Sequence, residues 1–146
     1  DTNLRNADST GIAASTATVQ GLIDAQIAAG IANQRIVVAG FSQGGAIAIH
    51  AGLRCPQPLA GIIGLSCYVL ERQQHSEQIH ASNQNTPIWM AHGTQDAMVP
   101  YDLGESSAAF LSANGHKVTF VSYPMGHEVS LPEITTLAQW LSEVLR

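Results

Sequence analysis

Short apolar runs alternate along the chain with longer segments whose apolar residues recur every three or four positions. This alternation is typical of a parallel sheet whose strands are connected by helices. We predict strands at the short, largely β-branched runs, residues 35–40, 59–65, 88–91 and 117–122. Helical spacing predicts helices at residues 12–29, 43–53 and 103–114 and in the C-terminal segment, with a polar connection over residues 67–86. These elements indicate the α/β class.

The C-terminal helix has the clearest boundary signals. Ser130 and Glu133 have the spacing of a capping box, and Pro132 suits a first helical turn. An apolar stripe follows, made of Ile134, Leu137, Ala138, Leu141 and Leu145. Because no repeat or linker interrupts the pattern, we expect residues 1–146 to form a single domain.

Charge and composition exclude several classes of function. The net charge of −5 and the scattered Lys and Arg residues disfavour a nucleic-acid or anionic-membrane partner. No apolar run approaches the roughly 18 residues of a membrane span. Residues 1–6 are polar and lack a signal-peptide core, which favours a cytoplasmic location. The two cysteines, Cys55 and Cys67, match no zinc-ligand spacing, and we expect both to be reduced.

Residues 40–44 read Gly-Phe-Ser-Gln-Gly and match the pattern G-x-S-x-G. A serine raised on a sharp turn between a strand and a helix brings the neighbouring backbone close, so Gly40 and Gly44 are expected to be small for steric reasons. The helix N-terminus next to Ser42 favours a developing negative charge. The alternative, a phosphate-binding turn, fits poorly because neither G-x-G-x-x-G nor G-K-[ST] is present. Ser42 is therefore the predicted nucleophile.

The predicted base and acid are His127 and Asp96. Each follows the end of a predicted strand, and the chain order Ser, Asp, His is that of α/β-hydrolases. The other candidates fail on order or placement: Asp8, Asp24, Asp102, His50, His75, His80, His92 and His116. We interpret His92, which precedes the predicted acid, as structural.

Three segments, residues 40–46, 92–100 and 123–129, resemble the motifs of the phospholipase/carboxylesterase family of α/β-hydrolases, which includes bacterial carboxylesterases and acyl-protein thioesterases. The resemblance implies the same catalytic triad and no metal or cofactor. It also implies that the backbone N–H of Gln43 is an oxyanion donor. Substrate contacts are expected at Tyr68, Met98 and Val99. Ser66-Cys67-Tyr68 stands where the family usually has Ser-Gly-Tyr, a difference that concerns the acyl pocket.

Members of that family have several strands before the nucleophile, with a His-Gly loop that completes the oxyanion hole. Here one helix and one strand precede Ser42, so we expect the C-terminal part of an α/β-hydrolase fold. The strand at 35–40 would then be an apolar edge, although residues 36–39 have the pattern of a strand buried on both faces. We expect a missing N-terminal fragment or a second copy of the chain in a homodimer to cover it, and we favour the fragment.

The leading hypothesis is a serine carboxylesterase that hydrolyses a small-molecule ester through an acyl-enzyme on Ser42. Within the same class, the alternative is an acyl-protein thioesterase or lysophospholipase. From another class, the alternative is a non-catalytic α/β-hydrolase remnant that binds a partner through its open sheet edge.

Overall fold

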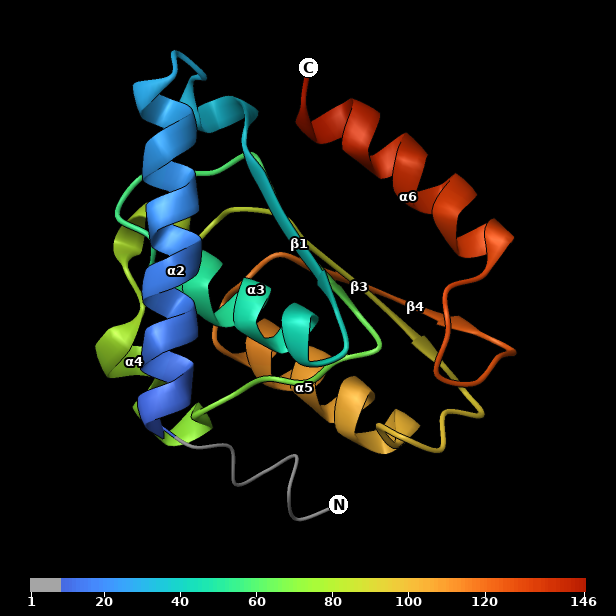
Figure 1. Ribbon diagram of the computed structural model, residues 1–146. Coiled ribbons are helices and arrows are strands. Elements are labelled where there is room, and N and C mark those ends of the chain that lie inside the picture. The colour runs from blue at the N-terminus through green and yellow to red at the C-terminus, as the bar shows by residue number, and fades with distance from the viewer. Residues whose placement is uncertain (1–8) are drawn as a thin grey trace.

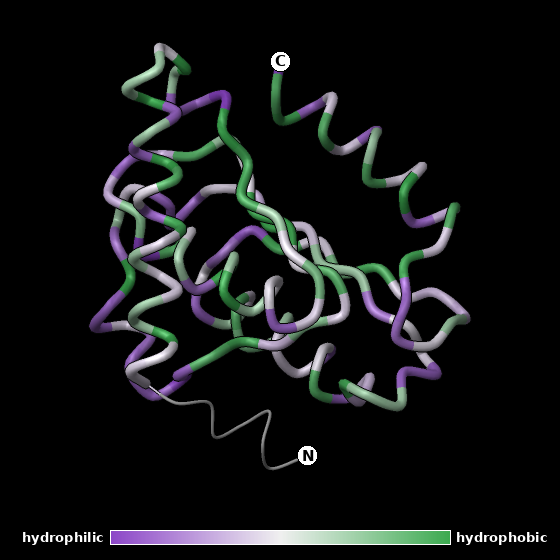
Figure 2. The backbone as a smooth tube through the Cα atoms, viewed as in Figure 1, coloured by the Kyte–Doolittle hydropathy of each residue, from purple (hydrophilic) through white to green (hydrophobic). Residues whose placement is uncertain are grey.

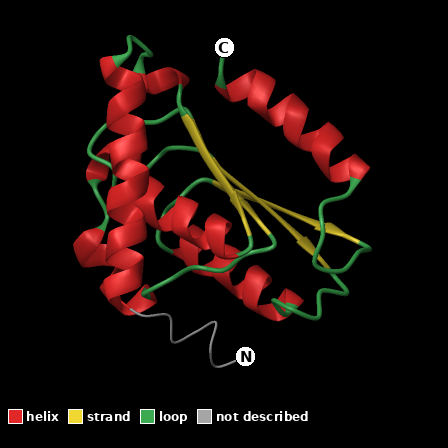
Figure 3. Cartoon of the chain, in the orientation of Figure 1, coloured by secondary structure: helices red, strands yellow, loops and turns green. Residues whose placement is uncertain are grey.

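The computed structural model describes residues 9–146, in which four parallel strands form one sheet in the order β1-β2-β3-β4. The strands are β1 (Val37–Phe41), β2 (Gly61–Leu65), β3 (Ile88–Gly93) and β4 (Val118–Tyr123). Since all four run in the same direction, their carboxyl ends meet at one edge of the sheet (Figure 3). The predicted α/β class and parallel sheet are confirmed.

Helices cover both faces of the sheet (Figure 1). One face carries α2 (Ser9–Ala28), α3 (Gln43–Arg54), the short α4 (His75–Gln78) and α5 (Tyr101–Ala113), and the other carries α6 (Leu131–Val144). Three 3-10 turns, η1 (Asn33–Arg35), η2 (Arg72–Gln74) and η3 (Ala81–Asn83), complete the elements. The helices and strands form where the periodicity predicts them, with ends shifted by a few residues. The predicted polar connection holds α4, η2 and η3, which are too short to give a periodic signal.

Alternate residues of the strands feed two separate apolar clusters. Toward α3 and α5, the cluster contains Ile49, Ile62, Ile88, Met90 and Leu111. Toward α6, it contains Ile63, Trp89, Ala91, Leu137 and Trp140. Figure 2 shows the strands as the hydrophobic centre of the molecule. Full burial of one such side chain contributes about 1.5–3 kcal/mol, so these clusters hold the helices against the two faces of the sheet.

Strand β1 lies at the edge of the sheet and pairs only with β2 among the described residues. Val37 and Val38 are half-buried, whereas Ala39 is exposed and Phe41 is 38% exposed. The expectation that residues 36–39 are buried on both faces is therefore wrong for the described part of the chain. The reason is that α6 packs on the middle of the sheet, where Trp140 contacts Gly61, and does not cover Ala39.

Within residues 9–146, no helix combines the length and apolar character needed to cross a bilayer. The polar residues 1–6 lie outside the described part. Cys55 and Cys67 are both free and buried.

Two glycines permit the sharp connection between β1 and α3. A Cβ atom on Gly40 would lie 2.1 Å from the Gly44 carbonyl oxygen, and one on Gly45 would lie 2.8 Å from the Gly40 oxygen and 2.9 Å from the Cβ of Cys67. A Cβ on Gly44 would meet no atom within 4 Å. The expectation that a side chain would collide with the backbone at both positions is thus right for Gly40 and wrong for Gly44. Successive helical residues project about 100° apart, so residue 45 faces the strand while residue 44 faces outward.

A buried polar cluster lies between α3, α4 and the start of β4. His75 Nε2 lies 2.8 Å from His116 Nε2, and His50 Nε2 lies 3.6 Å from the Glu71 carboxylate. Burial lowers the pKa of His50 to about 4, with further contributions from Arg54 and His75. Burial also lowers the pKa of His75 to about 4, and His116 and Arg54 act in the same direction. The folded protein therefore keeps both imidazoles neutral in mildly acidic solution.

The protein should lose stability between pH 6.5 and pH 4. In this range the unfolded chain, whose histidines titrate near pH 6.5, binds protons that folded His50 and His75 do not bind. One such histidine removes on the order of 3 kcal/mol over the full range. Urea denaturation at a series of pH values measures this loss. His50→Met should flatten the dependence, while His80→Met, at an exposed position, should not. An unchanged slope in His50→Met would contradict the assignment.

Gly45→Ala and Gly44→Ala should differ sharply. Because its added methyl group would collide with the Gly40 carbonyl and with Cys67, Gly45→Ala should lower the free energy of unfolding by several kcal/mol. Gly44→Ala should be neutral or slightly stabilising, since the methyl group meets open space and alanine favours helix by up to about 1 kcal/mol. Denaturant unfolding of the two variants compares them directly, and equal stabilities would show that the elbow is not sterically constrained.

Candidate active site

Ser42 lies between β1 and α3 in a conformation that is rare for a residue with a side chain. Its φ and ψ are 58° and −126°. Its N–H donates to the Leu65 carbonyl of β2 at 2.7 Å, and its own carbonyl accepts from the N–H groups of Gly45 and Ala46. Such backbone strain costs about 1–3 kcal/mol and persists only where the surroundings impose it. Here the sheet and the first turn of α3 hold the residue from both sides.

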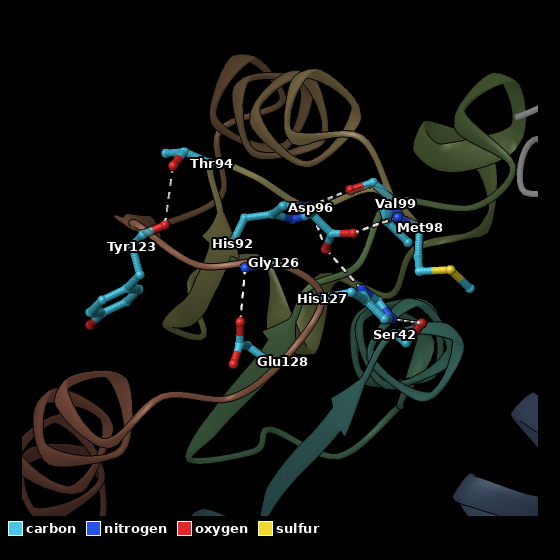
Figure 4. A network of polar contacts seen from close by, with 10 residues as sticks. All are labelled: Ser42, His92, Thr94, Asp96, Met98, Val99, Tyr123, Gly126, His127 and Glu128. Carbon is cyan, nitrogen blue, oxygen red and sulfur yellow. Dashed lines mark hydrogen bonds and ion pairs between the residues drawn. The ribbon is translucent and has the colours of Figure 1, made fainter.

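The side chain of Ser42 does not cap the helix that it precedes. A serine at this position usually accepts a hydrogen bond from the helix backbone, but Ser42 Oγ lies 3.0 Å from His127 Nε2 instead. His127 Nδ1 lies 2.8 Å from Asp96 Oδ2 (Figure 4). A carboxylate can only accept, so Nδ1 carries the hydrogen and Nε2 is free to accept from the serine hydroxyl. The structure thus brings the three residues into one hydrogen-bonded chain.

Asp96 is an ionised group in a buried setting. Its side chain is 0% exposed. Oδ1 accepts from the backbone N–H groups of Met98, at 2.9 Å, and Val99, at 2.8 Å. Burial by itself would raise the pKa of Asp96, but the hydrogen bonds from His127, Val99 and Met98 outweigh it and hold the pKa below its ordinary value. The carboxylate therefore remains charged at neutral pH.

The loops that carry Asp96 and His127 are joined through their backbones. The N–H of Gln95 donates to the Met125 carbonyl at 3.0 Å, and that of Thr94 donates to the Tyr123 carbonyl at 2.9 Å. A Cβ on Gly93 would lie 2.2 Å from the Met125 oxygen, so only glycine allows this approach. The separation of acid and base is consequently set by the main chain.

The N-terminus of α3 is the place beside Ser42 where backbone donors are available. The first N–H groups of a helix have no intrahelical acceptor, and that of Gln43 follows Ser42 directly. Together with the positive end of the helix dipole, it forms a setting for a developing oxyanion. The predicted oxyanion donor is therefore in place, while its role remains a prediction.

The three predicted substrate contacts lie in different environments. Tyr68 and Val99 are 3% and 1% exposed and pack in one apolar cluster with Ile12 and Leu70. Met98 is 65% exposed. Among these three residues, only Met98 has a large exposed surface that a ligand could contact in the described part of the chain. Contact with substrate remains a prediction for all three.

Cys67, where the family usually has glycine, lies beneath the elbow. Its Sγ fits into the space left by the missing side chains of Gly45 and Gly64, and the residue is 1% exposed. Burial raises the pKa of its thiol to about 12. The thiol is thus neutral, and it fills the space beneath Ser42.

Most rejected candidates lie away from this centre. Asp24, His80 and Asp102 are exposed, His50, His75 and His116 lie in the buried cluster, and Asp8 lies outside the described residues. No group of three or more His, Cys, Asp or Glu residues within 9–146 is arranged to hold a metal ion.

Sequence reasoning missed two neighbours of the triad. The ring of Phe41 lies 4.8 Å from that of His127, measured between centroids, and His92 Nε2 lies 3.4 Å from Asp96 Oδ2. One sequence signal for the second contact was available: His92 and Asp96 are four residues apart at the end of one strand.

Comparisons with known proteins give relatives of similar sequence and fold. The model of the phospholipase/carboxylesterase family matches residues 1–145. Acyl-protein thioesterase 1 of Neurospora crassa is 42% identical over 97% of this chain, which spans 59% of that relative's length. The solved structure of Arabidopsis thaliana SOBER1 matches with a TM-score of 0.90 and 30% identity, covering 95% of this chain and 67% of that one. Zea mays acyl-protein thioesterase 2 matches with a TM-score of 0.84 and 27% identity, with the same coverage.

The chain therefore spans about 60% of the length of the curated relative and two thirds of the solved structures. Sequence and fold agree over nearly all of its residues, and the chain belongs to the phospholipase/carboxylesterase family.

Proposed function

We propose that the protein hydrolyses carboxylic esters through an acyl-enzyme on Ser42. The observation that supports this most directly is the hydrogen-bonded chain from Ser42 through His127 to Asp96, with separations of 3.0 and 2.8 Å, at the N-terminus of a helix. A non-catalytic remnant would have no need to maintain a strained serine and a buried carboxylate in this alignment.

Each group has one task in the reaction. As Ser42 Oγ bonds to the ester carbonyl carbon, its proton passes to His127 Nε2, and the carbonyl oxygen takes the negative charge beside the Gln43 N–H. The tetrahedral intermediate collapses, and His127 returns the proton to the leaving alcohol. Water then attacks the acyl group by the same route and regenerates Ser42. Asp96 keeps the imidazole in the required tautomer and stabilises its charged form.

An apolar acyl group suits the surface around the nucleophile. Phe41, which ends β1 beside His127, is 38% exposed, and Met98, whose N–H donates to Asp96, is 65% exposed. We propose a short or medium acyl chain as the substrate's acid. A thioester of an acylated protein is the second candidate, because the same attack applies to it and the Neurospora relative is named a thioesterase.

The second oxyanion donor is proposed to come from outside residues 9–146, because the motif resemblance implies a His-Gly loop upstream of the nucleophile. Loss of one donor from a comparable hole lowers the rate about 100- to 1000-fold. We propose that a strand-bearing segment, of the kind that the longer relatives have room for, pairs with the edge of β1 that no described strand covers and brings this donor. Pairing of two copies through β1 is the alternative. A cytoplasmic location likewise remains a prediction.

A fluorophosphonate probe should label the protein at Ser42 alone. Ser42→Ala should abolish labelling. Ser66→Ala is the matched control, since Ser66 also ends a strand with a positive φ of 52° but is fully buried. Mass spectrometry of the labelled peptide identifies the site, and labelling that persists in Ser42→Ala would refute the assignment.

A further inference from the structure

His92 is a buried imidazole that lies beside the proposed acid, Asp96, on the same carboxylate oxygen as His127. It is the fifth residue of the six in β3 and is 1% exposed. Its ring lies against α5, where a Cβ on Gly104 would come within 2.3 Å of Nδ1. The ring of Tyr101 meets it edge-on, with 6.0 Å between centroids. The imidazole is therefore fixed in one orientation by the strand and the helix.

The hydrogen bond that His92 makes determines its tautomer. Nε2 lies 2.8 Å from the carbonyl oxygen of Val99. Since a carbonyl can only accept, Nε2 carries a hydrogen and donates it. The N–H of the same Val99 residue donates to Asp96 Oδ1 at 2.8 Å. His92 thus binds the carbonyl of the residue whose N–H binds the carboxylate.

The same nitrogen also faces the carboxylate itself. His92 Nε2 lies 3.4 Å from Asp96 Oδ2, the oxygen that accepts from His127 Nδ1 (Figure 4). This separation is longer than an ordinary hydrogen bond. The N–H dipole of His92 still attracts the negative oxygen, and this attraction opposes rotation of the carboxylate. Two imidazoles therefore converge on one oxygen while backbone N–H groups hold the other.

We infer that His92 is a positioning residue of the active site: by binding the Val99 carbonyl and facing Asp96 Oδ2, it fixes the carboxylate in the orientation that receives His127. The effect of His92 on catalysis rests on the proposed function, whereas its effect on the orientation of the carboxylate does not. His92 does not reach the surface where substrate would bind, so it acts on the reaction only through Asp96.

Two polar substitutions of His92 separate positioning from space filling. The side-chain amide of glutamine reaches as far as imidazole Nε2 and can donate to Val99, whereas that of asparagine reaches only as far as Nδ1. The matched control is His116→Asn, which alters another imidazole that is buried and bonded to a backbone carbonyl, that of Gln84, but far from the triad.

The direct readout is the proton on His127 Nδ1, followed by NMR in histidine-labelled protein. A proton held between imidazole and carboxylate resonates far downfield of the amides, and Asp96→Asn marks its loss. The wild type, His92→Gln and His116→Asn should keep this resonance. His92→Asn should lose it or shift it strongly upfield.

Reaction rates give the second readout. Fluorophosphonate labelling should slow by up to about 10-fold in His92→Asn, the equivalent of one lost ordinary hydrogen bond, and should stay near the wild-type rate in His92→Gln. With an ester substrate, kcat should fall while KM is unchanged.

The resonance and the rate distinguish the two proposals. If His92→Asn keeps both the resonance and the labelling rate, or if both His92 variants lose them equally, the positioning role is wrong and His92 only fills space. If the resonance behaves as described while the wild type neither reacts with the probe nor hydrolyses esters, the geometry of His92 is supported and the proposed function fails.

Discussion

The close approach of strand β1 to the first turn of α3 is the constraint on which the site depends. The backbone of the strand meets that of the helix directly at Gly40 and Gly45, which leaves no room for side chains there and forces the intervening Ser42 to a positive φ. This turn keeps the serine hydroxyl out of the helix cap and leaves the Gln43 N–H beside it. The positions of the proposed nucleophile and of the proposed oxyanion donor thus follow from one packing arrangement, stabilised by the apolar residues that hold α3 against the sheet.

The positions of Asp96 and His127, the proposed acid and base, depend on a different kind of interaction, the pairing of a buried charge. Asp96 has no access to solvent through its side chain, and an unpaired carboxylate there would be costly. The carboxylate accepts hydrogen bonds from His127, Met98 and Val99, and His92 donates to the Val99 carbonyl. Because these donors come from two loops joined by backbone hydrogen bonds, the fold places the imidazole before any substrate binds.

Much of this could be predicted from the sequence because the signals are local. Runs such as residues 35–40 and the capping box at Ser130 depend on neighbours along the chain, and the capping box forms with both of its hydrogen bonds. Asp96 and His127 were selected because each follows the end of a predicted strand and because their chain order fits. The exposure of Ala39, the tight fit at Gly45 in place of Gly44 and the contact of His92 with Asp96 escaped prediction. Each depends on which face of an element meets a distant segment, which periodicity does not specify.

The central claim is that Ser42 carries the acyl group during turnover. Intact-mass measurement during reaction with an activated short-chain ester, stopped by acid, tests it most directly. We expect a species heavier by one acyl group, with the adduct on the peptide that contains Ser42, and its disappearance as the ester is consumed. Ester turnover with Ser42 unmodified, or turnover at an undiminished rate in Ser42→Ala, would contradict the account.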